Sequence, residues 1–164
     1  MNGRSQSVQE RLCLNRYLSN IVLPNVVFFD PTDEFLSMLP SVIGDGCIID
    51  CGAGGGHATS KILEAGINIV GIDTIERHDA EAPIMQLDST LFPFQPGMFA
   101  MIARPCRGDW IQDTMDNAIS RGAKVIYAGL EKHFEEDLYS QSRFPLFLTD
   151  TAGRDGEWAF LLEP

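Results

Sequence analysis

The stretch IDCGAGGGH, residues 49–57, decides the fold predicted for this chain. It places Asp50 at the end of the apolar run Cys47–Ile49, and alternate glycines then lead into a segment of helical spacing, residues 57–65. Glycine carries no Cβ, so it permits a tight turn and lets a ligand approach the backbone. Ligands of doubly wound α/β folds bind just beyond the carboxyl ends of the strands. The stretch therefore predicts a strand, a ligand-binding turn and a helix.

Apolar runs and segments of helical spacing alternate along the rest of the chain. Strands are expected at residues 47–49, 67–72, 84–87, 98–103, 124–128, 146–149 and 158–162. Helices are expected at residues 57–65, 110–121 and 134–139. Apolar strands separated by helices predict a parallel sheet that is covered on both faces. The turn-rich stretch 152–156 lies between the last two strands, which should therefore form an antiparallel hairpin.

These elements predict an α/β fold of the Rossmann-like, doubly wound class, with a mostly parallel sheet of about seven strands and a C-terminal antiparallel hairpin. The linkers 74–82 and 89–97 hold at most a short helical piece each, so the helices after the second and third strands should be reduced. We assign residues 1–46 to an N-terminal helical extension and residues 47–164 to the ligand-binding domain, within a single domain overall.

The N-terminal extension carries its own helix signals. Residues 9–18 are expected to form a short helix. Asp30 followed by Pro31 predicts a second helix, with an aspartate cap and a proline in the first helical position, and Pro40 should end it. The apolar run 26–29 could cover the ligand site or pair with another subunit, but burial in the core is the preferred interpretation.

Composition excludes several classes of protein. The chain has 164 residues, 45% of them hydrophobic, and a formal net charge of −11, which repels phosphate backbones and argues against a nucleic-acid partner. No apolar stretch approaches the ~18 residues of a membrane span, and the first ten residues are polar, so we expect neither a membrane span nor a secretory signal. The four cysteines and three histidines show no metal-ligand spacing, so we expect no metal site and free thiols in a reducing cytoplasm.

The spacing of the glycines selects the ligand. The dinucleotide fingerprint requires Gly-x-Gly-x-x-Gly, but the sixth position is His57 when counted from Gly52 and Thr59 when counted from Gly54. The pattern that fits is Asp-x-Gly-x-Gly-x-Gly over residues 50–56. This pattern resembles the first motif of class I methyltransferases that use S-adenosylmethionine (SAM). An aspartate that opens the loop would repel a diphosphate and attract the ammonium group of SAM.

The resemblance implies a SAM site along the ends of successive strands. An acid at Asp73 would hold the ribose hydroxyls, Asp88 would accept a hydrogen bond from the adenine amino group, and Ile75 would pack on the adenine. Ala103 and Arg104 should lie near the transferable methyl group. The implied cofactor-binding residues are Asp50, Gly52, Ala53, Gly54, Gly56, Asp73, Thr74, Ile75, Asp88, Ser89, Ala103 and Arg104.

The acceptor side departs from better-known members of that family. Neither an Asn-Pro-Pro-Tyr-like motif nor the spaced Lys-Asp-Lys-Glu set of ribose methyltransferases is found. Arg104, Cys106 and Trp110 are weak catalytic candidates, for which an ion pair, a structural thiol and a core tryptophan are the respective alternatives. His57 is expected to pack or cap rather than to catalyse.

We therefore expect a SAM-dependent methyltransferase that acts on a small-molecule or protein acceptor and could form homo- or hetero-oligomers. Two alternatives stay open. One is a non-catalytic SAM-binding module, suggested by the short linkers and the missing acceptor motif. The other is a nucleotide-binding domain of the NAD type, which the glycine spacing disfavours.

Overall fold

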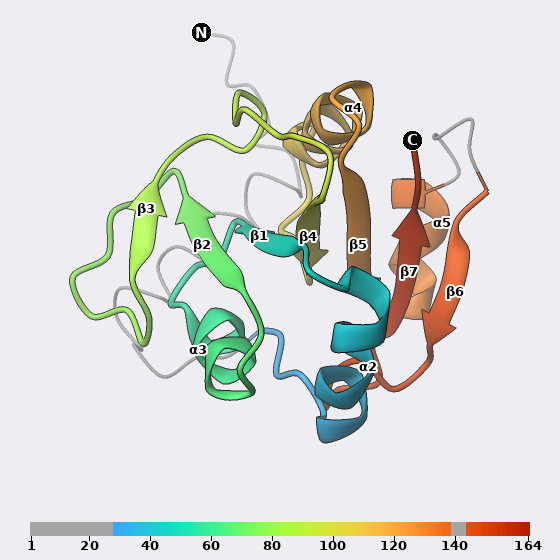
Figure 1. Cartoon of the computed structure of the whole chain (residues 1–164), viewed down its shortest axis with the longest axis horizontal. Coiled ribbons are helices and arrows are strands. Elements are labelled where there is room, and N and C mark those ends of the chain that lie inside the picture. Colours follow the sequence, from blue (N-terminus) through green and yellow to red (C-terminus); the bar gives the residue numbers. More distant parts are fainter. Residues whose placement is uncertain (1–27, 139–143) are drawn as a thin grey trace, which may run out of the picture.

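A single mixed sheet organises the molecule, and the computed structural model describes it over residues 28–138 and 144–164 (Figure 1). Its seven strands follow the order β3-β2-β1-β4-β5-β7-β6. Their bounds are β1 Cys47–Cys51, β2 Ile69–Asp73, β3 Ile84–Gln86, β4 Met98–Ala103, β5 Lys124–Gly129, β6 Leu146–Thr149 and β7 Trp158–Leu162. Only β7 runs against the others, since it pairs antiparallel with both β5 and β6. The predicted Rossmann-like, mostly parallel fold with a closing hairpin is confirmed.

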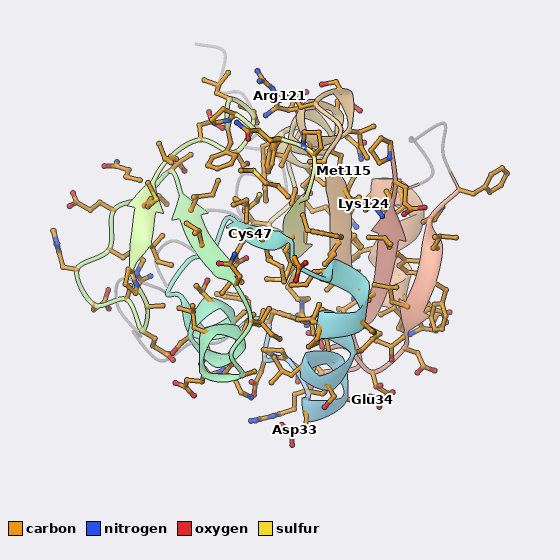
Figure 2. All side chains as sticks on the ribbon, in the orientation of Figure 1. Asp33, Glu34, Cys47, Met115, Arg121 and Lys124 are labelled. Carbon is orange, nitrogen blue, oxygen red and sulfur yellow. The ribbon has the colours of Figure 1, made fainter. Side chains whose placement is uncertain are left out.

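Helices cover both faces of the sheet. Helices α2 (Asp33–Ile43) and α3 (His57–Glu64) pack on one face, whereas α4 (Trp110–Ser120) and α5 (Glu131–Leu138) pack on the other. Figure 1 shows α2 and α3 on one side of the strands and α4 on the opposite side. Met115 of α4 is completely buried against the sheet (Figure 2).

The central strands are apolar on both sides because both of their faces are covered. Ile48 of β1 belongs to the cluster beneath α2 and α3, and the next residue, Ile49, belongs to the cluster beneath α4. In β4 and β5 every residue after the first is buried. These two strands and β1 therefore hold their carboxyl ends at fixed positions, on which a site can be built.

The connections around β3 carry no helix, as predicted. Residues 74–83 join β2 to β3 and residues 87–97 join β3 to β4 through turns alone. The edge strand β3 consequently lacks a helical cover, and Met85 and Leu91 are exposed. No helix within the described residues is long and apolar enough to cross a membrane.

The start and end predicted for the helix after Asp30 are wrong. The cap is Thr32, whose Oγ1 accepts a hydrogen bond from the Phe35 amide at 3.1 Å, and the helix begins only at Asp33. It then passes through Pro40 to Ile43. A threonine hydroxyl is a good N-cap, and Pro40 is tolerated because it removes one hydrogen bond on the exposed side of the helix.

The predictions for the second strand and for the apolar run 26–29 have different outcomes. The second strand begins at Ile69 rather than at residue 67, because the Ile67 amide donates to the Ile62 carbonyl and helps to close α3. Phe29 is buried and packs edge-to-face on Phe35, with ring centroids 5.9 Å apart, so burial is confirmed for this part of the run 26–29. The helix expected at residues 9–18, residues 26–27 and residue 139 lie outside the described residues.

Candidate ligand-binding site at the carboxyl edge

The glycine loop joins the carboxyl end of β1 to the start of α3. Gly52, Gly54 and Gly56 all have positive φ angles, of 73°, 57° and 77°. Residues with a Cβ rarely adopt this left-handed region, so glycine is required at each of the three alternate positions. The alternating pattern in the sequence is therefore a backbone requirement of the turn.

The amides of this loop point into the protein. The amides of Gly52 and Ala53 donate to the Ile72 carbonyl at 2.9 and 3.0 Å. The Gly56 amide donates to the Ala53 carbonyl at 3.0 Å, and the Gly54 amide donates to Asp73 Oδ2 at 2.8 Å. A loop that binds diphosphate presents its amides to the ligand instead. This turn is thus fixed against β2 and has few donors left for a phosphate.

Asp50 supports the loop from beneath. Its carboxylate is buried, and Oδ2 accepts a hydrogen bond of 2.7 Å from Thr59 Oγ1 in the first turns of α3. The neighbouring thiol of Cys51 has a pKa well above its usual range because of burial and the charge of Asp50. The Asp50 carboxylate therefore contacts α3, and its predicted attraction for the ammonium group of SAM stays a prediction.

Two further carboxylates stand at the ends of β2 and β3. Asp73 accepts hydrogen bonds from the Gly54 amide at 2.8 Å and the Ile75 amide at 3.0 Å. An ionised carboxylate offers about four acceptor positions, so two are used in this way. Asp88 is exposed, and its Oδ1 accepts from the amide and hydroxyl of Thr90 at 2.9 and 2.7 Å. The strand order brings both acids to the same edge as the glycine loop.

The remaining predicted cofactor residues divide by exposure. Thr74 and Ile75 are exposed at the end of β2, where a ligand could reach them. Ser89 is buried instead, and its hydroxyl lies 2.7 Å from Thr114 Oγ1 on α4. Its place in the site is corrected accordingly, because the side chain serves the packing of α4. Ala103 is buried at the end of β4.

Trp110, the first residue of α4, packs against the glycine loop. A Cβ added at Gly52 would lie 3.2 Å from Cη2 of the indole. Trp110 Nε1 donates to the Cys106 carbonyl at 3.0 Å, and the ring is partly buried against the α4-side cluster. The Cys106 thiol is free and partly exposed. The tryptophan therefore joins the loop to the segment that follows β4.

Arg104 has a strained backbone and an ion pair with a buried acid. Its φ of +44° is the only positive value among the described non-glycine residues, and strain of this kind is concentrated at functional sites. Nη1 lies 2.7 Å from Oε1 of Glu157 and 3.8 Å from Asp155 Oδ2. Glu157 is fully buried directly before β7, and the sequence analysis missed it. An acid immediately before the last apolar strand was the available signal.

A second buried acid lies on the α5 side of the same edge. Asp137 accepts a short hydrogen bond from the Tyr127 hydroxyl and a 3.0 Å bond from Arg107. Burial and the Asp137 carboxylate raise the pKa of Tyr127 strongly. This cluster ties α5 to the segment after β4. No group of three or more metal-ligand side chains occurs within residues 28–138 and 144–164.

Comparisons with known proteins identify the fold. No protein-family model matches the sequence, and no curated protein matches it. The structure is similar to the 1,6-didemethyltoxoflavin-N1-methyltransferase of Burkholderia thailandensis with bound 1,6-didemethyltoxoflavin and S-adenosylhomocysteine (TM-score 0.66, 12% identity, 99% of this chain and 92% of that chain). It is also similar to the SAM-bound magnesium protoporphyrin IX methyltransferase of Synechocystis PCC 6803 (TM-score 0.52, 12% identity, 99% and 85%).

A third similar structure belongs to a protein that is named for a different activity. It is described as precorrin 8W decarboxylase of Methanobacterium thermoautotrophicum (TM-score 0.51, 17% identity, 86% of this chain and 94% of that chain). At these identities the similarity establishes that this chain has the fold of SAM-dependent methyltransferases. The fold alone does not decide the reaction, which has to be argued from the site.

Proposed function

We propose that this protein binds SAM at the carboxyl edge of β1, β2 and β3 and transfers its methyl group to an acceptor beside β4. The observation that carries the proposal is the glycine loop, with three left-handed glycines directly beside Asp73. The acids at the ends of β2 and β3 supply acceptors for ribose hydroxyls and an adenine amino group. Two solved proteins of the same fold contain bound SAM or S-adenosylhomocysteine.

The chemistry of the loop favours SAM over a dinucleotide. Four amides of the loop are used inside the protein, so they are not presented to a diphosphate. Asp50 beneath the loop adds a negative charge, which would repel phosphate and favour the ammonium of an amino acid. Both features support the SAM hypothesis over the NAD-type alternative.

The proposed reaction makes modest demands on the side chains. SAM supplies a methyl group already activated by its sulfonium, and the acceptor atom bonds to that carbon as the carbon–sulfur bond breaks. The protein then contributes mainly by holding the two reactants in line, which can supply much of the rate. Arg104, set at the end of β4 by its ion pair with Glu157, is placed to shape the acceptor side.

We favour a small-molecule or protein acceptor over nucleic acid. The net charge of −11 opposes a phosphate backbone, and acids pair with several of the cations at this edge. The acceptor side also contains the exposed Asp155. A neutral or cationic acceptor suits these charges better than a polyanion.

Calorimetric titration tests cofactor binding. SAM and S-adenosylhomocysteine should bind to the wild-type protein, whereas NAD should not. Asp73→Ala should weaken binding by about 1–3 kcal/mol, because hydrogen-bond partners lose their acceptor. Glu76→Ala, which removes an exposed acid three residues later, should bind as the wild type does.

Turnover then separates an enzyme from a binding module. Release of S-adenosylhomocysteine in a screen of small-molecule and protein acceptors supports the methyltransferase. Binding without any release favours the non-catalytic alternative. Tight binding of NAD and none of S-adenosylhomocysteine contradicts the proposed function altogether.

A further inference from the structure

Asp30 lies two residues before the cap of α2 and contacts three basic side chains. His57 Nε2 and Lys61 Nζ lie 3.0 and 2.7 Å from Oδ1, and Arg154 Nη2 lies 2.6 Å from Oδ2. The Asp30 side chain is 13% exposed. Burial alone would raise its pKa, but the hydrogen bonds from Lys61 and His57 outweigh burial and lower it. The carboxylate is therefore held ionised among these partners.

Two of these partners belong to the helix that closes the glycine loop. His57 is the first residue of α3, and Lys61 follows one turn later. The other ring nitrogen of His57, Nδ1, lies 2.9 Å from Glu81 Oε2, and the Glu81 amide donates to the Gly55 carbonyl at 2.8 Å. Asp30 is thus linked through α3 to both the loop and the β2–β3 connection that packs on it.

The third partner belongs to the turn between β6 and β7. The Arg154 amide also donates to the Asp30 carbonyl at 2.9 Å. Gly153 packs so closely that an added Cβ would lie 2.1 Å from Glu157 Oε2. Glu157 in turn holds Arg104 at 2.7 Å. A continuous series of contacts therefore runs from α3 through Asp30 to the side chain at the end of β4.

Asp30 is not needed to start α2. Thr32 caps that helix with its own side chain. The three contacts of the Asp30 carboxylate that involve basic side chains all reach other parts of the fold, α3 on one side and the β6–β7 turn on the other. A residue that only stabilised the start of α2 would not require partners from both α3 and the β6–β7 turn.

We propose that Asp30 is a positioning residue that couples the glycine loop to the acceptor side, so that cofactor binding at the loop orders the β6–β7 turn and Arg104. The inference rests on the proposed function, because the bound molecule is taken to be SAM or its product. Asp30 itself touches neither reactant. It acts through α3 on the loop and through the turn on Arg104.

The test compares Asp30→Asn with the wild-type protein, with S-adenosylhomocysteine as the ligand. The variant should raise the calorimetric Kd at least tenfold. In hydrogen-exchange mass spectrometry, the ligand should slow amide exchange over residues 152–157 in the wild type and leave it unchanged in the variant. The second readout is the change in exchange that saturating ligand causes, so it reports coupling from the loop to the turn separately from any direct effect of losing the Asp30–Arg154 contact.

Asp33→Asn is the matched control. It makes the same chemical change three residues later, at an exposed position on the outer end of α2 (Figure 2). This variant should keep the Kd within twofold of the wild type and retain ligand protection at residues 152–157. Arg154→Gln gives a second route if Asp30→Asn fails to fold, because the Arg154 side chain is 75% exposed and its loss should spare the core.

The outcomes separate the two proposals. If the wild type binds S-adenosylhomocysteine but Asp30→Asn, or Arg154→Gln in its place, keeps both the affinity and the protection at residues 152–157, the coupling role is overturned and the proposed function stands. If the wild type does not bind the ligand, both proposals are overturned.

Discussion

The two halves of the carboxyl edge are shaped by different means. At the ends of β1 and β2, backbone geometry sets the shape, through left-handed glycines and amides that donate inward. At the ends of β4 and β5, side chains set it, through two buried acids that each hold an arginine, Glu157 with Arg104 and Asp137 with Arg107. In the proposed function, the first half would hold the cofactor and the second half would hold the acceptor.

This difference explains which half can be recognised in the sequence. The glycine loop is local, so its seven residues carry the whole pattern. The half shaped by side chains depends on residues far apart in the chain, such as 104 with 157 and 30 with 154. Substitutions in the two halves should therefore lower the stability of the protein for different reasons and by different amounts.

The largest effect is expected in the side-chain half. Glu157→Gln removes the charge of a fully buried acid and leaves Arg104 without its closest carboxylate. Removal of one partner from a buried pair is strongly destabilising, and because Arg104 is partly exposed we expect a loss of about 2–3 kcal/mol in the free energy of unfolding. Urea denaturation measures it.

Glu163→Gln provides the comparison for that variant. It makes the same change in the partly exposed Lys124–Glu163 pair, which is distant from the edge (Figure 2 labels Lys124). Exposed pairs contribute little, so a loss of less than ~0.5 kcal/mol is expected. Equal losses in the two variants would show that the buried pair has no special role.

A smaller effect is expected in the backbone half. Gly52→Ala places a Cβ at a φ of 73° and within 3.2 Å of Trp110, so the variant should lose about 1–2 kcal/mol of stability. Gly55→Ala is the matched change in the same loop, at a position with no atom within 4 Å of the added Cβ. Thermal and urea denaturation of this variant should give a change below ~0.5 kcal/mol. A larger loss of stability for Gly55→Ala than for Gly52→Ala would contradict the conformation described for the loop.

The smallest effect is expected where the two halves meet, in the pH dependence of stability. The pKa of Asp30 lies below its ordinary value, so its ionic contribution is present above the unfolded-state pKa of ~3.9 and is lost as the pH falls through the folded-state value. The stability difference between the wild type and Asp30→Asn should therefore be full at pH 7 and 5 and should shrink by pH 3. A constant difference at all three pH values would exclude this ionic contribution of Asp30.

The predictable part of the fold follows from burial. Strands covered on both faces are continuous apolar runs, and β4 and β7 have the bounds expected from the sequence. The ends of helices were harder to predict, because more than one neighbouring residue can serve as the N-cap. Both Asp30 and Thr32 are good caps; Thr32 serves α2, whereas the Asp30 carboxylate pairs with basic side chains elsewhere in the fold.

The positions of the candidate residues were predictable where strand ends define them. Asp73 and Asp88 lie at the edge expected for them. The spacing of residues along the sequence does not show which way each side chain points. The buried orientations of Asp50 and Ser89 were therefore not predicted. Glu157 and Asp30 were missed as parts of this edge because their roles depend on partners elsewhere in the chain.

A crystal structure of the protein grown with S-adenosylhomocysteine tests the central claim most directly. Our account predicts the amino-acid tail over residues 52–56 and the ribose hydroxyls within hydrogen-bond distance of the Asp73 carboxylate. Ligand density away from the glycine loop, or none at saturating concentration, would contradict it.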